Sequence, residues 1–192
     1  MDQPHTLKTA TSLSEAFCLG RFVGVAIEKV LINVPIIGNE YSDDKGSIVK
    51  FTLVRVVYSN LWQNRICTNI RTGDHNIRMV DSEGFQYSAG MNVYEGTEKA
   101  EVKISNKQAI KYNFISAEAR LEPSAKTRGW LWFPGLPKGV FPRRFIFDFR
   151  VFDPGCDPIN LESLEIKFEF EPNQPLLDEV GFKTLELEKN EC

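Results

Sequence analysis

Apolar and polar residues alternate with a period of two along much of the chain. The run SLEIKFEFEP shows this most clearly, because Leu164, Ile166, Phe168 and Phe170 alternate with charged or polar residues. Such a period places successive side chains on opposite faces of a β-strand, one face buried and the other facing water. The same pattern predicts further strands at 22–34, 48–59, 110–117, 129–133 and 143–152, and a hairpin at 77–88.

Two of the expected strands are apolar on both faces. Residues 48–59 have this character, which is typical of a central strand. In the stretch RGWLWFPGLPKGV, Trp130 and Trp132 share one face of a strand, and Leu131 and Phe133 share the other. One of these faces must meet the core, and the other needs a cover or a contact partner.

Turn signals separate the expected strands. Asp81 and Gly84 occupy the favoured first and fourth positions of a type I turn, and the segment GNEYSDDKGS reads as a loop. Seven to nine strands without a long amphipathic helix predict an all-β fold, an antiparallel β-sandwich. A closed barrel with the same number of strands is the alternative.

The chain divides into one large domain with an extension at each end. Residues 1–20 are expected to form an N-terminal arm with a short helix, since Ser12 and Glu15 have the spacing of a capping box. Residues 21–172 are expected to form the sandwich. Residues 173–192 form a C-terminal tail that packs on the sandwich or extends it, with a helical turn and an edge strand at 182–186 or as an irregular arm.

Composition narrows the classes of function. The 192 residues are 42% hydrophobic and 26% charged, which is ordinary for a globular domain. With 23 basic and 26 acidic residues the net charge is -3, which argues against nucleic-acid binding. No run approaches the ~20 apolar residues of a membrane helix, so no integral membrane segment is expected. The first 20 residues lack the features of a signal peptide. The expected location is cytoplasmic if Met1 is native, and extracytoplasmic if a leader has been removed.

The residues that could carry chemistry are scattered. Cys18, Cys67, Cys156 and Cys192 lack zinc-site spacing, and four free thiols are favoured over two disulfides. The histidines are His5 and His75, and neither stands in a recognisable catalytic arrangement. The sequence therefore predicts a protein without enzymatic activity and without a cofactor. Weak candidates for oxygen ligands of calcium are turn aspartates: Asp43, Asp44, Asp153 and Asp157.

The tryptophans are the candidate binding residues. Trp130 and Trp132 could be covered by a terminal extension, could contact a protein partner or a second copy of the chain, or could stack against a carbohydrate. Trp62, in the polar setting NLWQN, is a further candidate contact residue, or a loop anchor. Protein binding or self-association is the favoured function. Carbohydrate binding is the alternative, and an enzyme without a recognisable site ranks third.

Three stretches occur in an order and spacing that resemble a known family. They are VRVVYSN, with alternating valines that end in Asn60; MVDSEGFQYS, with the pattern D-x-x-G-x-x-Y; and GWLWFPGLPKGVFPRRFIFDF, two strands joined by a loop. Together they cover roughly residues 25–152. They resemble a widespread family of bacterial immunoglobulin-like β-sandwich domains that is grouped with a secreted immunoprotective antigen of mycobacteria.

The resemblance implies an immunoglobulin-like sandwich. It assigns Gly129, Leu131 and Phe133 to the core face, and Trp130 and Trp132 to the outer face. Members of the family are mostly exported or lipid-anchored, and the family supplies no catalytic residues. A binding or structural role is what the resemblance implies for this chain.

Overall fold

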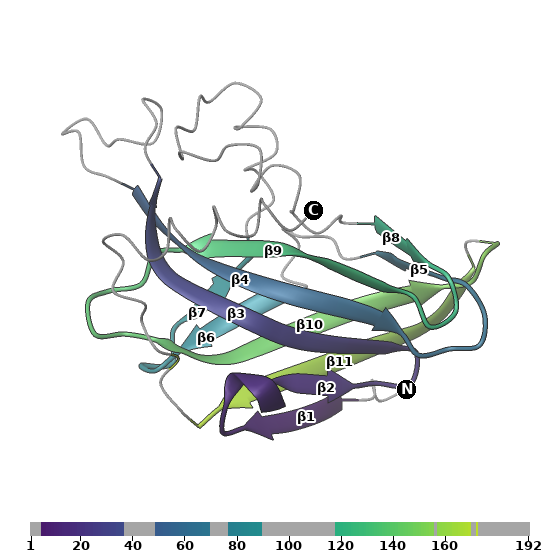
Figure 1. The fold of residues 1–192 in the computed structure, drawn as a ribbon, viewed down its shortest axis with the longest axis horizontal. Coiled ribbons are helices and arrows are strands. Elements are labelled where there is room, and N and C mark those ends of the chain that lie inside the picture. Colours follow the sequence, from purple (N-terminus) through teal and green to yellow (C-terminus); the bar gives the residue numbers. More distant parts are fainter. Residues whose placement is uncertain are drawn as a thin grey trace.

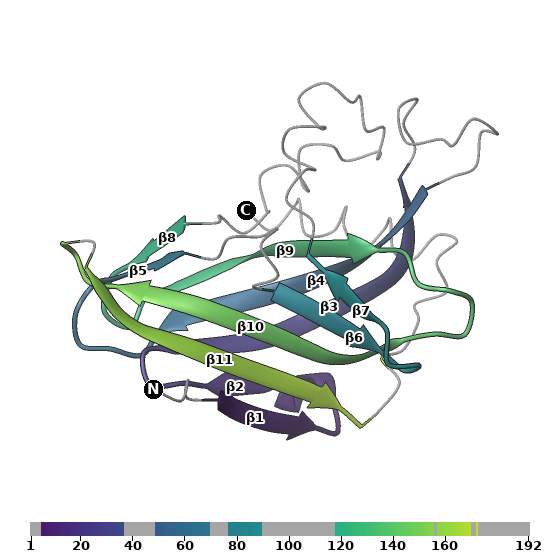
Figure 2. The same ribbon diagram turned by 180° about the vertical axis from the view of Figure 1, so that it is seen from behind.

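The described residues form two β-sheets packed face to face. A computed structural model describes residues 5–36, 49–69, 77–89, 118–155, 157–169 and Pro172. Figure 1 shows the smaller sheet in front, and Figure 2 shows the larger sheet from the opposite side. The predicted all-β sandwich is confirmed. The expected strand at 110–117 and the tail at 173–192 lie outside the described residues.

The smaller sheet has four antiparallel strands in the order β2-β3-β4-β9. The long strand β4 lies between two neighbours, as its two apolar faces predict. Strand β9, which carries Trp130 and Trp132, pairs with β4 at one edge of this sheet. The bounds are β2 (Phe17–Leu19), β3 (Val23–Ile36), β4 (Val49–Asn60) and β9 (Lys126–Pro134).

The larger sheet follows the order β1-β11-β10-β5-β8, and the hairpin of β6 and β7 also pairs with β10. Its pairs are antiparallel except for β1, which runs parallel to β11. The bounds are β1 (His5–Ala10), β5 (Ile66–Asn69), β6 (Ile77–Asp81), β7 (Gln86–Ser88), β8 (Glu118–Leu121), β10 (Pro142–Phe152) and β11 (Pro158–Phe168).

The core between the sheets is rich in aromatic side chains. Tyr58 of β4 packs edge-on against Phe149 of β10, with ring centroids 5.2 Å apart, and Phe133 of β9 packs against Phe145 of β10. Inter-sheet aromatic contacts of this kind add to the burial of large apolar areas. The alternation of apolar residues in the predicted strands 129–133 and 143–152 and in the run SLEIKFEFEP leads us to expect six side chains in the core, and all six are buried there: Leu131, Phe133, Phe147, Phe149, Ile166 and Phe168.

Strand β3 departs from a simple period of two. Its register shifts between Ile27 and Lys29 and again between Leu31 and Val34. Asn33 lies in the second irregularity with φ of 58°, a conformation that asparagine tolerates better than most residues. Its side chain accepts a hydrogen bond from the Leu136 N–H at 2.8 Å and donates one to the Leu136 carbonyl at 2.9 Å. The irregularity thus fixes the loop that follows β9.

The expected N-terminal arm contributes a strand to each sheet. Residues 5–10 form β1 in the larger sheet, and residues 17–19 form β2 in the smaller sheet, so both lie side by side along one edge of the sandwich (Figures 1 and 2). The short helix between them is a 3-10 turn, Leu13–Glu15. Ser12 makes no side-chain cap there; Glu15 instead accepts hydrogen bonds from the Thr11 N–H and hydroxyl. These bonds lower the pKa of Glu15.

A buried carboxylate fastens this N-terminal segment to the larger sheet. Glu162 of β11 accepts hydrogen bonds from the backbone N–H groups of Arg21, Phe22 and Val23, at 2.8, 2.9 and 3.0 Å. The chain passes the carboxylate closely, since a Cβ atom added at Gly20 would lie 2.5 Å from Glu162 Oε2. The pattern of the sequence did not predict this contact.

The hairpin turn forms as predicted. Gly84 has φ of 93°, and its N–H donates to the Asp81 carbonyl at 3.2 Å. Asp81 Oδ1 accepts from the N–H groups of Glu83 and Phe85, while Oδ2 accepts from the Tyr87 hydroxyl at 2.8 Å. The spacing D-x-x-G-x-x-Y therefore holds one carboxylate that serves the turn and the following strand. Phe85, between the turn and β7, is exposed.

We expect Tyr87 to make the free energy of unfolding of the protein fall as the pH rises through the alkaline range. Burial and the hydrogen bond to Asp81 raise the pKa of Tyr87 to about 12, above its value near 10 in an unfolded chain. Below about pH 10 the full stabilisation is present, and it is lost as the pH rises toward 12, because only the unfolded chain ionises in that window. Urea unfolding of wild type and Tyr87→Phe between pH 8 and 12 checks this.

At pH 8 the Tyr87→Phe variant should be less stable by about 1–2 kcal/mol, because Asp81 loses a hydrogen bond. The difference between the two proteins should shrink between pH 10 and 12. The contribution of Tyr58 is common to both proteins and cancels. If the difference in the free energy of unfolding between wild type and Tyr87→Phe stays constant up to pH 12, the raised pKa of Tyr87 is contradicted.

Candidate functional site

The outward faces of the two sheets differ in chemistry. On the larger sheet Arg78 pairs with Asp148 at 2.6 Å, and the Ser163 hydroxyl donates to the same carboxylate at 2.7 Å. Arg144 of β10 pairs with Glu165 of β11 at 3.2 Å. These two groups of side chains give the face a charged and polar character, which is ordinary for the solvent face of a sandwich.

The outward face of the smaller sheet carries an aromatic and aliphatic cluster. Register pairs Trp130 with Arg55, Trp132 with Leu53, and Leu53 with Leu31. Alternate residues of the same strands, among them Val54 and Leu131, belong to the core. We call the outward set the tryptophan cluster: Leu31, Phe51, Leu53, Trp130 and Trp132.

The two tryptophans project from the outer face, the placement that the resemblance implies, but they are unequally accessible. Trp130 is only 2% exposed, and the Arg55 guanidinium lies 5.9 Å from its ring centroid. Trp132 is half-buried and packs edge-on against Phe51, with centroids 4.7 Å apart. Trp130 therefore does not present an open indole face in this structure.

Accessible apolar side chains lie at the other end of the same sheet. Phe17 and Leu19 of β2 are 43% and 57% exposed, and Leu61, which follows β4, is 42% exposed. A Cβ atom added at Gly24 would lie 3.0 Å from Leu19 Cδ2 and 3.5 Å from Leu61 Cδ1, so both leucines lie over this glycine. We call Phe17, Leu19 and Leu61 the exposed apolar cluster.

Sequence reasoning missed the exposed apolar cluster. Phe17 and Leu19 alternate with the buried Cys18, but three residues are too few to establish a period of two. Leu61 stands in a polar loop, next to Trp62. Only the pairing of β2 with β3 brings these side chains onto one face.

Trp62 serves as a loop anchor in this structure. It is half-buried against the core and packs edge-on against Phe22 at 5.4 Å. The backbone N–H of Trp62 donates a hydrogen bond to Asn60 Oδ1 at 2.8 Å.

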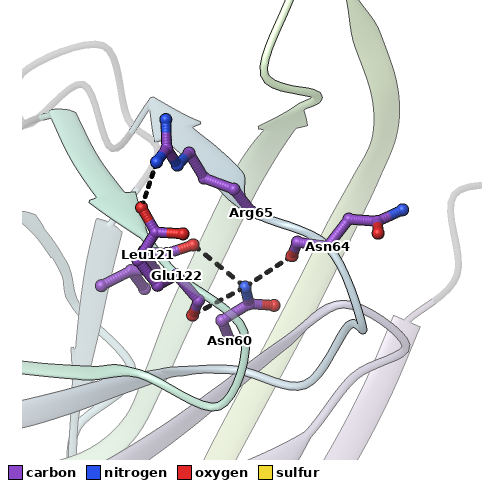
Figure 3. Close-up of polar contacts among 5 residues, drawn as sticks. All are labelled: Asn60, Asn64, Arg65, Leu121 and Glu122. Carbon is purple, nitrogen blue, oxygen red and sulfur yellow. Dashed lines mark hydrogen bonds and ion pairs between the residues drawn. The ribbon is translucent and has the colours of Figure 1, made fainter.

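The side chain of Asn60 ties this loop to the turn before β9. Its Nδ2 donates to the carbonyls of Asn64, Leu121 and Glu122 at 2.8, 3.0 and 3.0 Å, and Arg65 pairs with Glu122 at 2.5 Å (Figure 3). Asn60 ends the stretch VRVVYSN, and these bonds give that position a structural role.

The candidate calcium ligands do not form a site among the described residues. Asp153 Oδ1 accepts hydrogen bonds from the backbone N–H groups of Gly155 and Asp157. An aspartate that stabilises a turn typically makes such bonds. In the part of the chain that the structure describes, no three His, Cys, Asp or Glu residues come together as metal ligands. Asp43 and Asp44 lie outside the described residues, as does His75.

Two of the four cysteines can be placed. Cys18 and Cys67 are free thiols. Burial raises the pKa of the Cys18 thiol, which donates to the Thr6 carbonyl at 3.4 Å. Cys156 and Cys192 lie outside the described residues. Among the described residues, no helix is long and apolar enough to cross a membrane.

Comparisons with known proteins leave the family open. No protein-family model matches the chain, and no curated protein matches it significantly. A solved structure with a similar arrangement is that of the yjhA protein from Bacillus subtilis, with 12% identity and a TM-score of 0.44 over 79% of this chain and 96% of that one. This likeness carries no argument about function, and the resemblance to the mycobacterial antigen family stays a prediction.

Proposed function

We propose that the protein is a non-enzymatic binding module that contacts another protein through the outer face of the β2-β3-β4-β9 sheet. The observation that carries the proposal is the exposed apolar cluster, Phe17, Leu19 and Leu61, gathered at one end of this face. Single exposed apolar residues are common on protein surfaces, whereas adjoining ones are typical of contact surfaces.

The larger sheet supplies a comparison within the same molecule. Leu7 and Leu161 are 53% and 48% exposed there, but each stands beside charged residues, since Leu7 is in register with Glu165 and Leu161 with Arg150. They do not adjoin one another along the strands. The smaller sheet is therefore the better candidate for a protein contact.

Protein binding is favoured over carbohydrate binding by the state of the tryptophans. A sugar ring stacks on an open aromatic face. Trp130 is 2% exposed and Trp132 already packs against Phe51, so the pair does not offer a flat double platform. The exposed apolar cluster consists of two leucines and one phenylalanine, which suit a protein partner better than a sugar.

The double variant Leu19→Ser, Leu61→Ser tests the proposal. We expect it to remain folded, because both side chains are exposed, and to lose the partner that wild type retains from a lysate of the source organism. Self-association, measured by sedimentation velocity between 5 and 200 µM, should fall in the same variant if the partner is a second copy. Burying such side chains contributes roughly 1.5–3 kcal/mol each.

The matched control is Leu7→Ser, Leu161→Ser, which removes two equally exposed leucines from the larger sheet. It should retain the same partner and the same sedimentation behaviour as wild type. Retention of all partners by the Leu19→Ser, Leu61→Ser variant would overturn the proposal.

A further inference from the structure

The four strands of the smaller sheet have an unusual balance of charge. Their sequences contain the basic residues Lys29, Lys50, Arg55, Lys126 and Arg128. Glu28 is the only acidic residue in these strands. The whole chain has a net charge of -3, so the basic character is local to this sheet.

The single carboxylate of the sheet is already paired. Glu28 contacts Arg55 at 3.4 Å and Arg128 at 2.8 Å. Among the described strand residues, one carboxylate is thus shared by two guanidinium groups, and basic side chains outnumber it. Lys126 lies at the start of β9 on the same face and is exposed.

Strand register places these cations beside the exposed apolar cluster. One row across the sheet runs Leu19, Gly24, Ser59 and Lys126, and the next runs Phe17, Ala26, Val57 and Arg128. Neighbouring strands are about 4.8 Å apart, so Lys126 is roughly 10 Å from Gly24, over which Leu19 and Leu61 lie. The residues between are small or of medium size.

Two further cations border the cluster on the side of β2. The Lys8 ammonium lies 5.4 Å from the centroid of the Phe17 ring. Arg21 is exposed in the connection between β2 and β3. Glu15, just before β2, accepts hydrogen bonds from Thr11.

We propose that the exposed apolar cluster and the flanking cations bind an acidic segment of a partner protein that carries apolar side chains. Apolar groups of the segment cover Leu19 and Leu61, and carboxylates reach Lys126 and Arg128 about three or four residues further along an extended chain. Charge complementarity of this kind gives specificity and speeds association. The proposal rests on the proposed function and specifies the chemistry of the partner.

The probe is a display library of random twelve-residue peptides, selected on wild type and counter-selected on the Leu19→Ser, Leu61→Ser variant. We expect the enriched peptides to hold more Asp and Glu than Lys and Arg, next to Leu, Ile or Phe. A synthetic copy of the best peptide should bind at least about tenfold more tightly than the same peptide with Lys in place of each acidic residue. Its affinity should fall between 25 and 300 mM NaCl, because salt screens exposed charges.

Charge variants make the test specific to this face. Lys126→Glu should weaken binding of the acidic peptide by roughly three- to tenfold. Lys138→Glu, which reverses an exposed lysine in the loop after β9, is the control and should leave the affinity unchanged. Both variants should melt at the wild-type temperature.

Several results would overturn the proposal: no enrichment of acidic peptides, equal binding of the lysine-substituted peptide, or no effect of Lys126→Glu. Binding to vesicles of phosphatidylcholine and phosphatidylserine that depends on Leu19 and Leu61, without peptide binding, would assign the face to membranes. If a lysate partner still depends on Leu19 and Leu61 but not on Lys126 or salt, the acidic chemistry is wrong while the proposed function stands.

Discussion

Replacing Glu162 by alanine is expected to lower the free energy of unfolding by about 3–5 kcal/mol. The carboxylate is buried and accepts hydrogen bonds from three consecutive backbone N–H groups, those of Arg21, Phe22 and Val23. Without it, these donors lose their acceptor at a position where the Glu162 side chain is 2% exposed. Urea unfolding at pH 7 measures the loss. Replacing the exposed Glu169, which directly follows the same strand, by alanine is the control and should change the free energy of unfolding by less than about 0.5 kcal/mol.

A double-mutant cycle with Gly20 isolates the contact. Gly20→Ala alone should be destabilising, because its Cβ atom would lie 2.5 Å from Glu162 Oε2. In the Glu162→Ala background that clash is removed, so the same substitution should cost much less. Additive effects of the two changes, or a loss below about 1 kcal/mol for Glu162→Ala, would contradict the geometry.

Replacing Trp130 by alanine should cost about 3–5 kcal/mol, the usual loss for a large aromatic residue removed from a buried position. Trp130 is 2% exposed although it points away from the sandwich core. The loss should therefore show as a lower melting temperature, with no change in oligomeric state. Thermal unfolding together with sedimentation velocity measures both.

Trp132 is half-buried, so Trp132→Ala is the matched comparison. It should lower the free energy of unfolding less than Trp130→Ala does. If Trp130→Ala instead melts like wild type and forms a smaller assembly, Trp130 belongs to a contact between chains, and the tryptophan cluster rather than the exposed apolar cluster carries the function.

Local alternation was sufficient to predict most of the core. Strands β10 and β11 were recognisable because Phe147, Phe149 and Ile166 recur at every second position, and both faces of β4 are apolar because it is a central strand. The same period placed Trp130 and Trp132 on one face of their strand, and the resemblance, not the period, implied that this face is the outer one. The turn at Asp81 was recognisable because its residues interact within a few positions of one another.

Such local patterns could not predict contacts between residues that are far apart in the sequence. Glu162 meets Phe22 across 140 positions, and nothing around either residue indicates the other. The sequence HTLKTA of β1 has too few apolar residues to read as a strand, and it becomes one only by pairing with β11. The exposed apolar cluster likewise depends on the pairing of β2 with β3, so its location could not be read from composition or period.

The parallel strand β1 also bears on how the protein avoids aggregation. It covers Ser163–Phe168, the second half of the long strand β11, where Leu164, Ile166 and Phe168 alternate. Exposed backbone groups of such a strand are a template for pairing with another chain, and a short, polar edge strand is a common protection. A chain shortened by its first ten residues would present this half of β11 as an open edge. We expect such a chain to aggregate into fibril-like assemblies through that edge.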